Sequence, residues 1–444
     1  MLKRLFDPKV IGAVVIAAVV LVFSSIGMTQ KAGSVSNETY DSLKIFSDVL
    51  GIVQQDYAEE VQPKKLIYGA IKGMMRDLDP HSNFLSPEEY SEMQIDTKGV
   101  FGGIGIEIGV KDNLLTVIAP IEDTPAFKAG IASGDRIVKI GEKSTKDMGL
   151  NEAVTLMRGP VGSNVTIHIM REGFDEPRPF TLTRAVIKVK SVKFKMLDEG
   201  FGYVKINQFQ ERTSEELDKA LNELSAKSDG GRLKGLVLDL RNNPGGLLQE
   251  AVSVSNEFID SGLIVYTKGR AAGQNMTFNA DGKRSQPGYP MIVLVNNGSA
   301  SASEIVAGAL QDHKRAMILG VTTFGKGSVQ TIIPLSDGSA VRLTTSKYYT
   351  PSGRSIQAKG IEPDIVVGIA PKGHLKEADL EGHLAAEGPE VKQAKQEERI
   401  EKIKGAPADA PKLDKETAED VQLQRAVEYL KSWFIFKGTT QKVS

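Results

Sequence analysis

The chain has 444 residues, of which 41% are apolar and 25% charged, the proportions of a folded protein with two or three domains. A net charge of −1 gives no reason to expect nucleic acid as a partner. The absence of cysteine excludes disulfides, thiol nucleophiles and cysteine-bound zinc, and no other cluster of ligands indicates a metal or nucleotide cofactor.

Residues 1–30 have the pattern of a membrane anchor. Lys3, Arg4 and Lys9 precede an uncharged run over 10–28, which as a helix would cover most of a hydrocarbon core about 30 Å thick. Basic residues on this side favour a cytoplasmic N-terminus and export of the remainder. A cleaved signal peptide is the alternative. Either interpretation places the bulk of the chain in an extracytoplasmic space such as the periplasm, anchored to the inner membrane or released from it.

Three folded segments are expected next. Over 31–96, apolar residues recur at three- and four-residue spacing, which predicts a helical region interrupted by the turn-rich stretch LDPHSNFLSPEEY. Short strands are expected over 97–185. Over 186–370, the buried-type strands GLVLDL and MIVLVNN are each followed by a turn and a helix, and this order predicts an α/β core with a mostly parallel sheet. Thr213 and Glu216 have capping-box spacing at the start of a further helix.

The last segment, 371–444, changes composition. Its first part is rich in charge, alanine and proline, which predicts a solvated linker. It closes with a helical pattern in which Leu423, Val427, Leu430 and Phe434 form one apolar stripe. We expect this stripe to dock on its own domain; a contact with another subunit or a partner is the alternative.

A candidate nucleophile lies in the turn GSASAS at 298–303, between a predicted strand and a predicted helix. Chemistry in parallel α/β sheets gathers at the carboxyl ends of strands, and a helix N-terminus there supplies unpaired N–H groups and positive potential. A serine at this place could attack a carbonyl while the oxyanion is stabilised. Serine is also a common helix cap, and chemistry alone does not choose among Ser299, Ser301 and Ser303.

Lys326 is the favoured base for such a serine. A general base must come within about 3 Å of the proton that it takes, and His313, the histidine nearest in sequence, lies too far along the same helix. His81 is left open by its spacing. Lys326 lies between Gly325 and Gly327, which allow close backbone approach. It must lose its charge to act, and burial or a nearby helix N-terminus would lower its pKa.

Several motifs occur in the order found in the C-terminal processing peptidases, also called tail-specific proteases, and the chain resembles that family over about residues 36–366. The motifs are LDPHSNFL, GGIGIEI, MRGPVGS, DLRNNPGG, GSASASEIVAGALQDH, FGKGSVQ and YYTPSGRSIQAKGIEPD. The resemblance implies a multidomain α/β protein, with a ClpP/crotonase-like protease core, an inserted PDZ domain and an N-terminal helical region. It also implies a serine endopeptidase or C-terminal processing protease that cleaves extracytoplasmic proteins.

The resemblance also implies roles for individual residues. Ser301 is the nucleophile, Lys326 is the base, and Gln330 orients the lysine. The backbone N–H groups of Ala302 and Gly246 form the oxyanion hole. On one strand, the four-residue spacing of Lys326 and Gln330 would place both side chains on the same face.

The GGIGIEI segment resembles a PDZ carboxylate-binding loop, which implies peptide binding at Gly103, Ile104, Gly105 and Ile106. Successive N–H groups there would hold a terminal carboxylate while the peptide adds as a strand. A plain glycine-rich hairpin is the alternative. The resemblance to the family also implies that Arg158 helps to couple peptide binding to activity. The implied partners are protein and peptide substrates, an activating or adaptor protein, and further copies of the chain in a homo-oligomer.

Three competing functions fit parts of the sequence. GVTTFGK at 320–326 matches the first part of a P-loop, but glycine follows the lysine and a strand is predicted next, so we reject an ATPase. A non-catalytic PDZ scaffold would use Ser301 only as a helix cap. A Ser-His-Asp protease would need His81 beside Ser301, and the G-x-S-x-G motif of one such class is absent.

Overall fold

The structure is a computed structural model that describes residues 37–197, 200–283, 286, 288–368, 375–386 and 420–440. The chain divides into two compact units, residues 1–70 and 71–444. The predicted anchor at 10–28 lies outside the described residues. Among the residues that are described, no helix combines the length and the apolar composition needed to cross a membrane.

The helices expected near the N-terminus are present. The described chain begins with α2 (Asn37–Asp56), a helix of 20 residues with no buried side chain. Its exposed surface carries many large apolar side chains, namely Tyr40, Leu43, Ile45, Phe46, Val49 and Ile52. The next helix, α3 (Pro63–Arg76), crosses the boundary between the two units and buries Met75.

The turn-rich motif LDPHSNFL leads into a strand and a capped helix. Its last residues form β1 (Asn83–Leu85), and α4 (Pro87–Lys98) follows directly. Ser86 caps α4 through a capping box with Glu89, and Gly99 ends the helix in the left-handed conformation. The motif therefore supplies a turn and a sheet strand, and the capped helix follows it.

The region over 100–188 has its own sheet and its own core. A six-stranded antiparallel sheet runs in the order β3-β4-β5-β7-β8, with β6 pairing with β5, and α5 (Pro125–Lys128) and α6 (Leu150–Met157) pack against it. A two-stranded ribbon of β2 (Val100–Gly103) and β9 (Ala185–Lys188) closes the region where the chain enters and leaves. The strands of the sheet are β3 (Ile106–Lys111), β4 (Leu114–Pro120), β5 (Arg136–Ile140), β6 (Lys143–Ser144), β7 (Asn164–Met170) and β8 (Arg178–Thr183).

The predicted mostly parallel sheet is confirmed. Six strands run in the order β10-β11-β12-β15-β16-β19, and all neighbours are parallel except β10 and β11. The strands are β10 (Val192–Met196), β11 (Phe201–Ile206), β12 (Gly235–Asp239), β15 (Met291–Val295), β16 (Met317–Gly320) and β19 (Ile365–Val366). The strands β12 and β15 are buried along their whole length, because helices cover both faces of the sheet.

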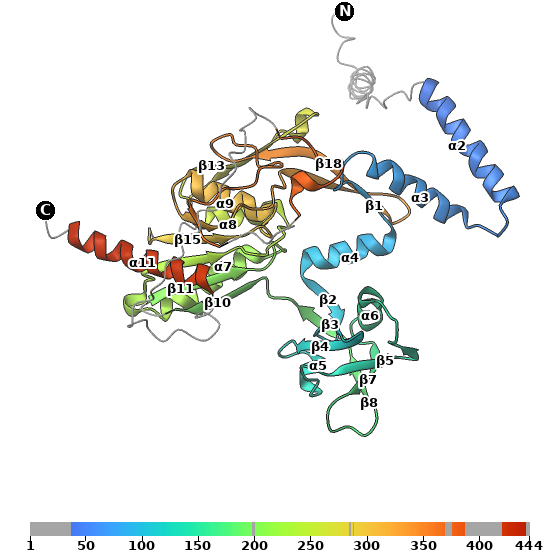
Figure 1. Cartoon of the computed structure of the whole chain (residues 1–444), viewed down its shortest axis with the longest axis horizontal. Coiled ribbons are helices and arrows are strands. Elements are labelled where there is room, and N and C mark those ends of the chain that lie inside the picture. The colour runs from blue at the N-terminus through green and yellow to red at the C-terminus, as the bar shows by residue number, and fades with distance from the viewer. Residues whose placement is uncertain are drawn as a thin grey trace, which may run out of the picture. The chain divides into compact units, whose positions relative to one another are not determined.

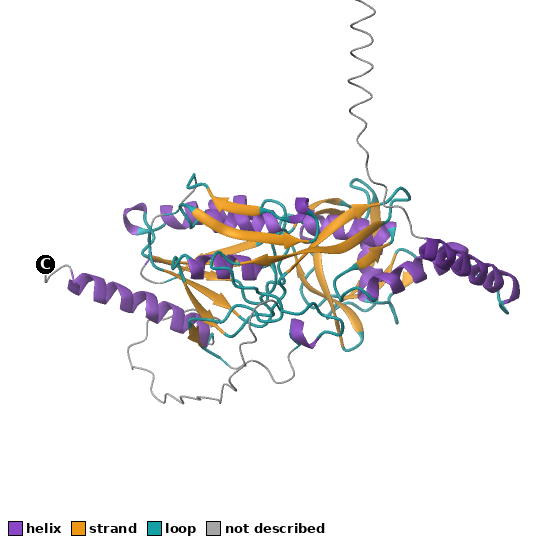
Figure 2. Cartoon of the chain, turned by 90° about the horizontal axis from the view of Figure 1, so that it is seen from above, coloured by secondary structure: helices purple, strands orange, loops and turns teal. Residues whose placement is uncertain are grey.

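Side chains alternate between these two faces. Leu236 and Leu238 of β12 pack with helices α7 (Thr213–Ala226), α8 (Leu248–Asn256) and α9 (Ala302–Asp312). Val237 points to the other face, where it packs with the C-terminal helix α11 (Val421–Thr440). The predicted docking of α11 on its own domain is confirmed for Leu423, Val427 and Leu430, which are all buried. In Figure 2, α11 is the helix beside the label of the C-terminus. The side chain of Phe434 lies outside the described residues.

Truncation of this stripe should destabilise the protein. We expect Leu430→Ala, at a side chain that is 2% exposed, to lower the free energy of unfolding by about 2–5 kcal/mol through lost burial and a residual cavity. Tyr429→Ala, at an exposed position on the same helix, should change it by less than about 0.5 kcal/mol. Chemical denaturation measures both values, and equal effects would mean that α11 does not dock in solution.

A second, antiparallel sheet lies on the other side of α8 and α9. It runs in the order β1-β18-β13-β14, with β17 paired to β18, and α8 and α9 contact β13 while α8 also contacts β14 (Figure 1). Its longer strands are β13 (Gly262–Gly269), β14 (Thr277–Ala280), β17 (Ser328–Pro334) and β18 (Ala340–Tyr349). Through β1, the sheet includes the last three residues of the LDPHSNFL motif.

Two local predictions are wrong. Thr213 does not cap α7 but is its first helical residue, and Glu216 accepts hydrogen bonds from the backbone and hydroxyl of Ser191 instead of closing a capping box. In the predicted solvated linker, residues 375–386 pack against the domain, and Glu377 in the short helix η4 (Glu377–Asp379) is fully buried. Most of the remaining linker lies outside the described residues.

Candidate active site

The GSASAS turn joins the carboxyl end of β15 to the N-terminus of α9. Ser301 is the N-cap of α9. Its backbone has φ 55° and ψ −114°, a conformation that residues other than glycine rarely adopt. Such backbone strain persists where the surroundings enforce it, often at functional sites. The turn is fixed on both sides, because the N–H of Ala300 donates to the Asn243 carbonyl and the N–H of Phe324 donates to the Ser299 carbonyl.

The structure separates the three candidate serines by their surroundings. Ser299 and Ser303 are fully buried, and their hydroxyls donate to the carbonyls of Leu240 (2.8 Å) and Asn243 (2.9 Å). Both therefore hold the turn together. Ser301 is half-buried, so of the three it has the hydroxyl that a substrate can reach.

Glu304 ties the serine turn to the lysine loop. Its Oε2 accepts hydrogen bonds from the backbone N–H groups of Ser301 (2.7 Å) and Lys326 (3.0 Å), and its Oε1 accepts from the Gly325 N–H (2.7 Å) and the Thr323 hydroxyl (2.5 Å). Burial raises the pKa of this carboxyl to about 7, although all four donors favour its ionised form. Glu304 was not singled out in the sequence, yet its capping-box spacing three residues after Ser301 was visible there.

Lys326 lies in the loop between β16 and β17 and is half-buried. Its pKa is lowered first by burial and then by the nearby Arg342, while Glu377, Asp79 and Glu304 oppose the shift. The net direction is the one that a lysine base requires, because only the neutral amine accepts a proton. The buried Tyr348 hydroxyl donates to the Lys326 carbonyl and also interacts with the Ser301 side chain.

The predicted strand relation between Lys326 and Gln330 is wrong, because β17 begins only at Ser328. The Gln330 amide donates to the hydroxyls of Ser328 (3.0 Å) and Thr344 (3.3 Å). Among the described residues, no hydrogen bond joins the Lys326 amine to Gln330 or to the hydroxyl of Ser301. The serine and lysine loops are therefore brought together through their backbones, which both donate to Glu304.

Two free backbone donors lie beside Ser301. Within the described part of the chain, the N–H groups of Gly246 and Ala302 find no hydrogen-bond acceptor, whereas the Gly245 N–H is taken by the Asn243 side chain (2.9 Å). A Cβ on Gly245 would lie 2.8 Å from the Cβ of Ser301, which shows how closely the two turns approach. Gly246 has φ 141°, and a Cβ there would lie 2.1 Å from a backbone oxygen, so this position requires glycine.

The turn that carries these glycines is held by a charged network absent from the sequence predictions. Arg241 pairs with Asp239 at the end of β12 (2.6 Å) and with Asp420 at the start of α11 (2.6 Å). The two carboxylates raise the pKa of the Arg241 guanidinium against the opposing effect of burial. The helix α11 thus contacts the same turn that presents Gly246.

His81 lies near this site but has another partner. Its Nε2 lies 2.8 Å from Oε2 of Glu377, and no hydrogen bond joins it to Ser301 in the described structure. The geometry therefore gives no support to a triad with His81. The P-loop alternative also fails, since Lys326 is followed by the strand β17 and not by a helix.

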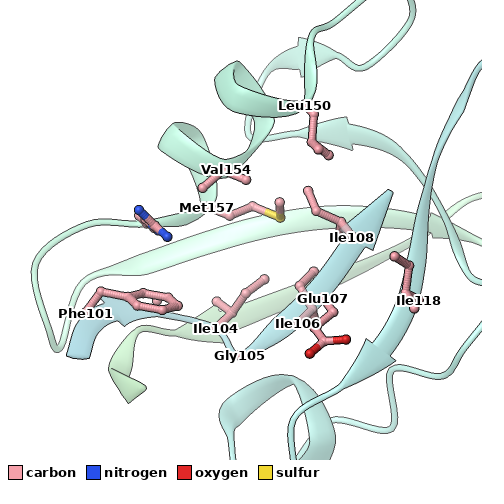
Figure 3. Close-up of a pocket in the computed structure, with 12 residues that line it drawn as sticks. Phe101, Ile104, Gly105, Ile106, Glu107, Ile108, Ile118, Leu150, Val154 and Met157 are labelled. Atoms are coloured by element: carbon pink, nitrogen blue, oxygen red, sulfur yellow. The ribbon is translucent and has the colours of Figure 1, made fainter. Parts of the chain in front are cut away.

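A separate apolar pocket of about 350 Å³ opens in the region over 100–188 (Figure 3). The predicted loop residues 103–106 and Arg158 all line it, together with aliphatic side chains from β3 and α6. The carbonyls of Ile104 and Gly105 accept hydrogen bonds from the backbone N–H groups of Ala126 and Ile121. Within the described residues, the N–H groups of Ile104 and Gly105 themselves have no acceptor. Gly105 has φ +80°, and a Cβ there would lie 2.3 Å from Thr124, so the loop requires glycine at this position.

Attack by a serine on an acyl carbon is the chemistry that the first site supports, and the second site has the form of a peptide-end pocket. Fold and sites together define a serine hydrolase with an attached peptide-binding domain. Sequence models match at three places: Peptidase family S41 at 200–367, PDZ domain at 102–177 and Activating protease CtpB N-terminal domain at 18–89.

Relatives extend the match over most of the chain. The Carboxy-terminal-processing protease of Bartonella bacilliformis is 46% identical over 94% of this chain and 94% of its own length. The Carboxy-terminal processing protease CtpA of Bacillus subtilis is 38% identical over 82% of this chain and 76% of its own, and a Probable CtpA-like serine protease of Staphylococcus aureus is 39% identical over 82% and 72%. The chain belongs to the carboxy-terminal processing proteases of peptidase family S41 and is a serine-type peptidase with a PDZ domain.

Proposed function

We propose that this peptidase cleaves exported proteins with a Ser301–Lys326 dyad and selects them by their C-termini. The observation that carries the dyad is the Glu304 carboxylate, one oxygen of which binds the backbone of both residues. Ser301 attacks the scissile carbonyl, and neutral Lys326 takes the hydroxyl proton and later gives it to the leaving amine. The free N–H groups of Gly246 and Ala302 bind the oxyanion, a role worth about 10²–10³ in rate per donor.

The remaining catalytic role falls to Gln330. Its side chain now bonds to Ser328 and Thr344, and Thr344 in turn donates to Asp79 (3.0 Å). To act on Lys326, the amide would have to leave these partners. Orientation of the Lys326 amine by Gln330 therefore accompanies formation of the contact with Ser301.

Recognition of substrate C-termini belongs to the apolar pocket. The two free N–H groups of its loop suit a carboxylate, and its aliphatic lining suits a C-terminal apolar side chain. Arg158 stacks on the Phe101 ring at 4.4 Å and lies 3.7 Å from Asp96 of α4. The Asp96 carbonyl accepts from Gln210, and the neighbouring Phe209 pairs with the backbone at 245–247. A chain of contacts therefore connects the peptide pocket to the turn that carries the N–H of Gly246.

Location and assembly are part of the same proposal. The uncharged run at 10–28 behind basic residues supports anchoring in the inner membrane, or release after cleavage, with the peptidase in the periplasm. The exposed apolar side chains of α2 support contact with further copies of the chain or with an activating or adaptor protein.

The selection of C-termini is tested with a matched pair of peptides. We expect a fluorogenic peptide with a free C-terminal valine to be cleaved with a KM about tenfold or more below that of its C-terminal amide, because amidation removes a charge-assisted acceptor for the loop N–H groups. Val154→Glu, which adds a negative charge to the pocket, should abolish this difference, while Val161→Glu, exposed on the same domain and outside the pocket lining, should preserve it. Equal KM values for both peptides with the wild-type protein would refute recognition of the carboxylate.

A further inference from the structure

The chain returns to the catalytic loop after the peptidase family match ends at residue 367. In the segment 375–386, the N–H of Glu377 donates to the carbonyl of Phe324, two residues before Lys326 (3.2 Å). Further along, the carbonyls of Leu384 and Ala385 accept from Gln357 (3.1 Å) and Lys347 (3.2 Å). The segment is therefore fixed against the catalytic domain at both of its ends.

Glu377 is the centre of this contact. Its carboxylate is fully buried, and it lies 2.8 Å from His81 Nε2 and accepts a 2.8 Å hydrogen bond from the Gln357 amide. The Gln357 oxygen in turn accepts from the N–H of Gly327 (2.8 Å). One buried carboxylate thus links the LDPHSNFL turn, the C-terminal segment and the residue that follows Lys326. A charge this deep is stable only with such partners.

The charges around Lys326 come from four elements. Arg342 on β18 lowers its pKa, while Glu377 from the C-terminal segment, Asp79 from the LDPHSNFL turn and Glu304 from α9 raise it. The effect is mutual, because Lys326 and His81 contribute to the lowered pKa of Glu377. Glu377 therefore acts on Lys326 in two ways, by holding its loop and by favouring its charged form.

We propose that Glu377 is a positioning residue for Lys326, and that the contact of Glu377 with the loop at 324–327 is consequently part of the active site. This rests on the proposed role of Lys326 as the base. A carboxylate that served only to stabilise the fold would affect melting and leave the protonation of the base unchanged. A positioning residue must also move the pH dependence of catalysis.

The test is the pH profile of kcat/KM for the full-length protein on a fluorogenic peptide. Glu377→Gln keeps the shape, and its amide can donate to His81 in the other tautomer while its oxygen still accepts from Gln357. Only the charge is lost. Since activity requires neutral Lys326, loss of a carboxylate that favours the ammonium should move the acidic limb to lower pH, by about one unit.

Two further variants give the comparison. Glu377→Ala leaves His81 and Gln357 without their partner, so the loop at Gly327 loses its support and kcat should fall about ten- to a hundredfold. Glu381→Gln, the same charge change at an exposed position of the segment, should leave both the limb and kcat unchanged. Glu377 is named among the groups that shift the pKa of Lys326, so a displaced acidic limb is the change expected from the lysine.

An unmoved acidic limb in Glu377→Gln overturns the proposal, even if Glu377→Ala melts early or fails to fold, because the carboxylate would then be structural only. Lys326→Met measured in parallel separates this result from failure of the dyad. If Lys326→Met is inactive and the Glu377→Gln limb is unmoved, only the role of Glu377 is lost. If Lys326→Met stays active, the dyad and the inference fall together.

Discussion

Replacement of Lys326 by methionine is expected to lower kcat on a peptide substrate by at least about 10⁴-fold, and Ser301→Ala should do the same. Methionine keeps an unbranched apolar stem in the half-buried site but has no amine to accept the serine proton. Arginine at 326 should be equally inactive, because a guanidinium is never neutral in a protein. The double variant should be no slower than either single one, since the two residues act in one step.

The measurement is single-substrate kinetics with circular dichroism on each variant, so that lost activity is separated from lost fold. Lys359→Ala is the matched control, because this lysine is exposed and also precedes a glycine, in a segment that packs beside Gly325. Retention of more than about a hundredth of wild-type kcat in Lys326→Met would exclude this lysine as the base. Inactivation by His81→Ala, with the fold intact, would then favour a histidine base.

The sequence predicted the layers of the molecule well because their signals are local. Uninterrupted apolar runs such as GLVLDL predict strands buried on both faces, and β12 is such a strand. The stripe of Leu423, Val427 and Leu430 predicted a helix that must cover something, and it covers the sheet. In both cases the periodicity of the chain decides the outcome, and no distant residue has to be known.

The sequence identified the loops that form the site, but it did not show which of their side chains contact one another. Chemistry alone left three serines open. In the fold, Ser299 and Ser303 differ from Ser301 by their full burial and by the carbonyls of Leu240 and Asn243, some 60 residues away in the chain, that accept from them. The spacing of Lys326 and Gln330 misled because the strand begins after the lysine. Glu377 lies in a stretch whose composition is that of a solvated linker, and composition cannot show that one carboxylate of such a stretch is buried by tertiary contacts.

Replacement of Glu304 by glutamine should produce the second large loss of activity, about 10²-fold in kcat with a smaller change in KM. The carboxylate accepts from four donors with two oxygens, and an amide would turn one of those oxygens into a donor. Either the N–H groups of Ser301 and Lys326 or the donors from 323 and 325 would then face an NH₂ group. The serine turn and the lysine loop would separate, and a displacement of about 1 Å is enough for a loss of this size.

The same substitution should lower the free energy of unfolding by about 2–5 kcal/mol, because two buried donors lose their acceptor. Glu216→Gln is the informative comparison, since that carboxylate also holds backbone and hydroxyl donors, at Ser191, but away from Ser301 and Lys326. It should reduce stability and leave kcat within about twofold of wild type. If Glu304→Gln likewise lost stability but kept its kcat, the carboxylate would serve only to stabilise the fold. Other contacts would then have to hold the serine turn next to the lysine loop.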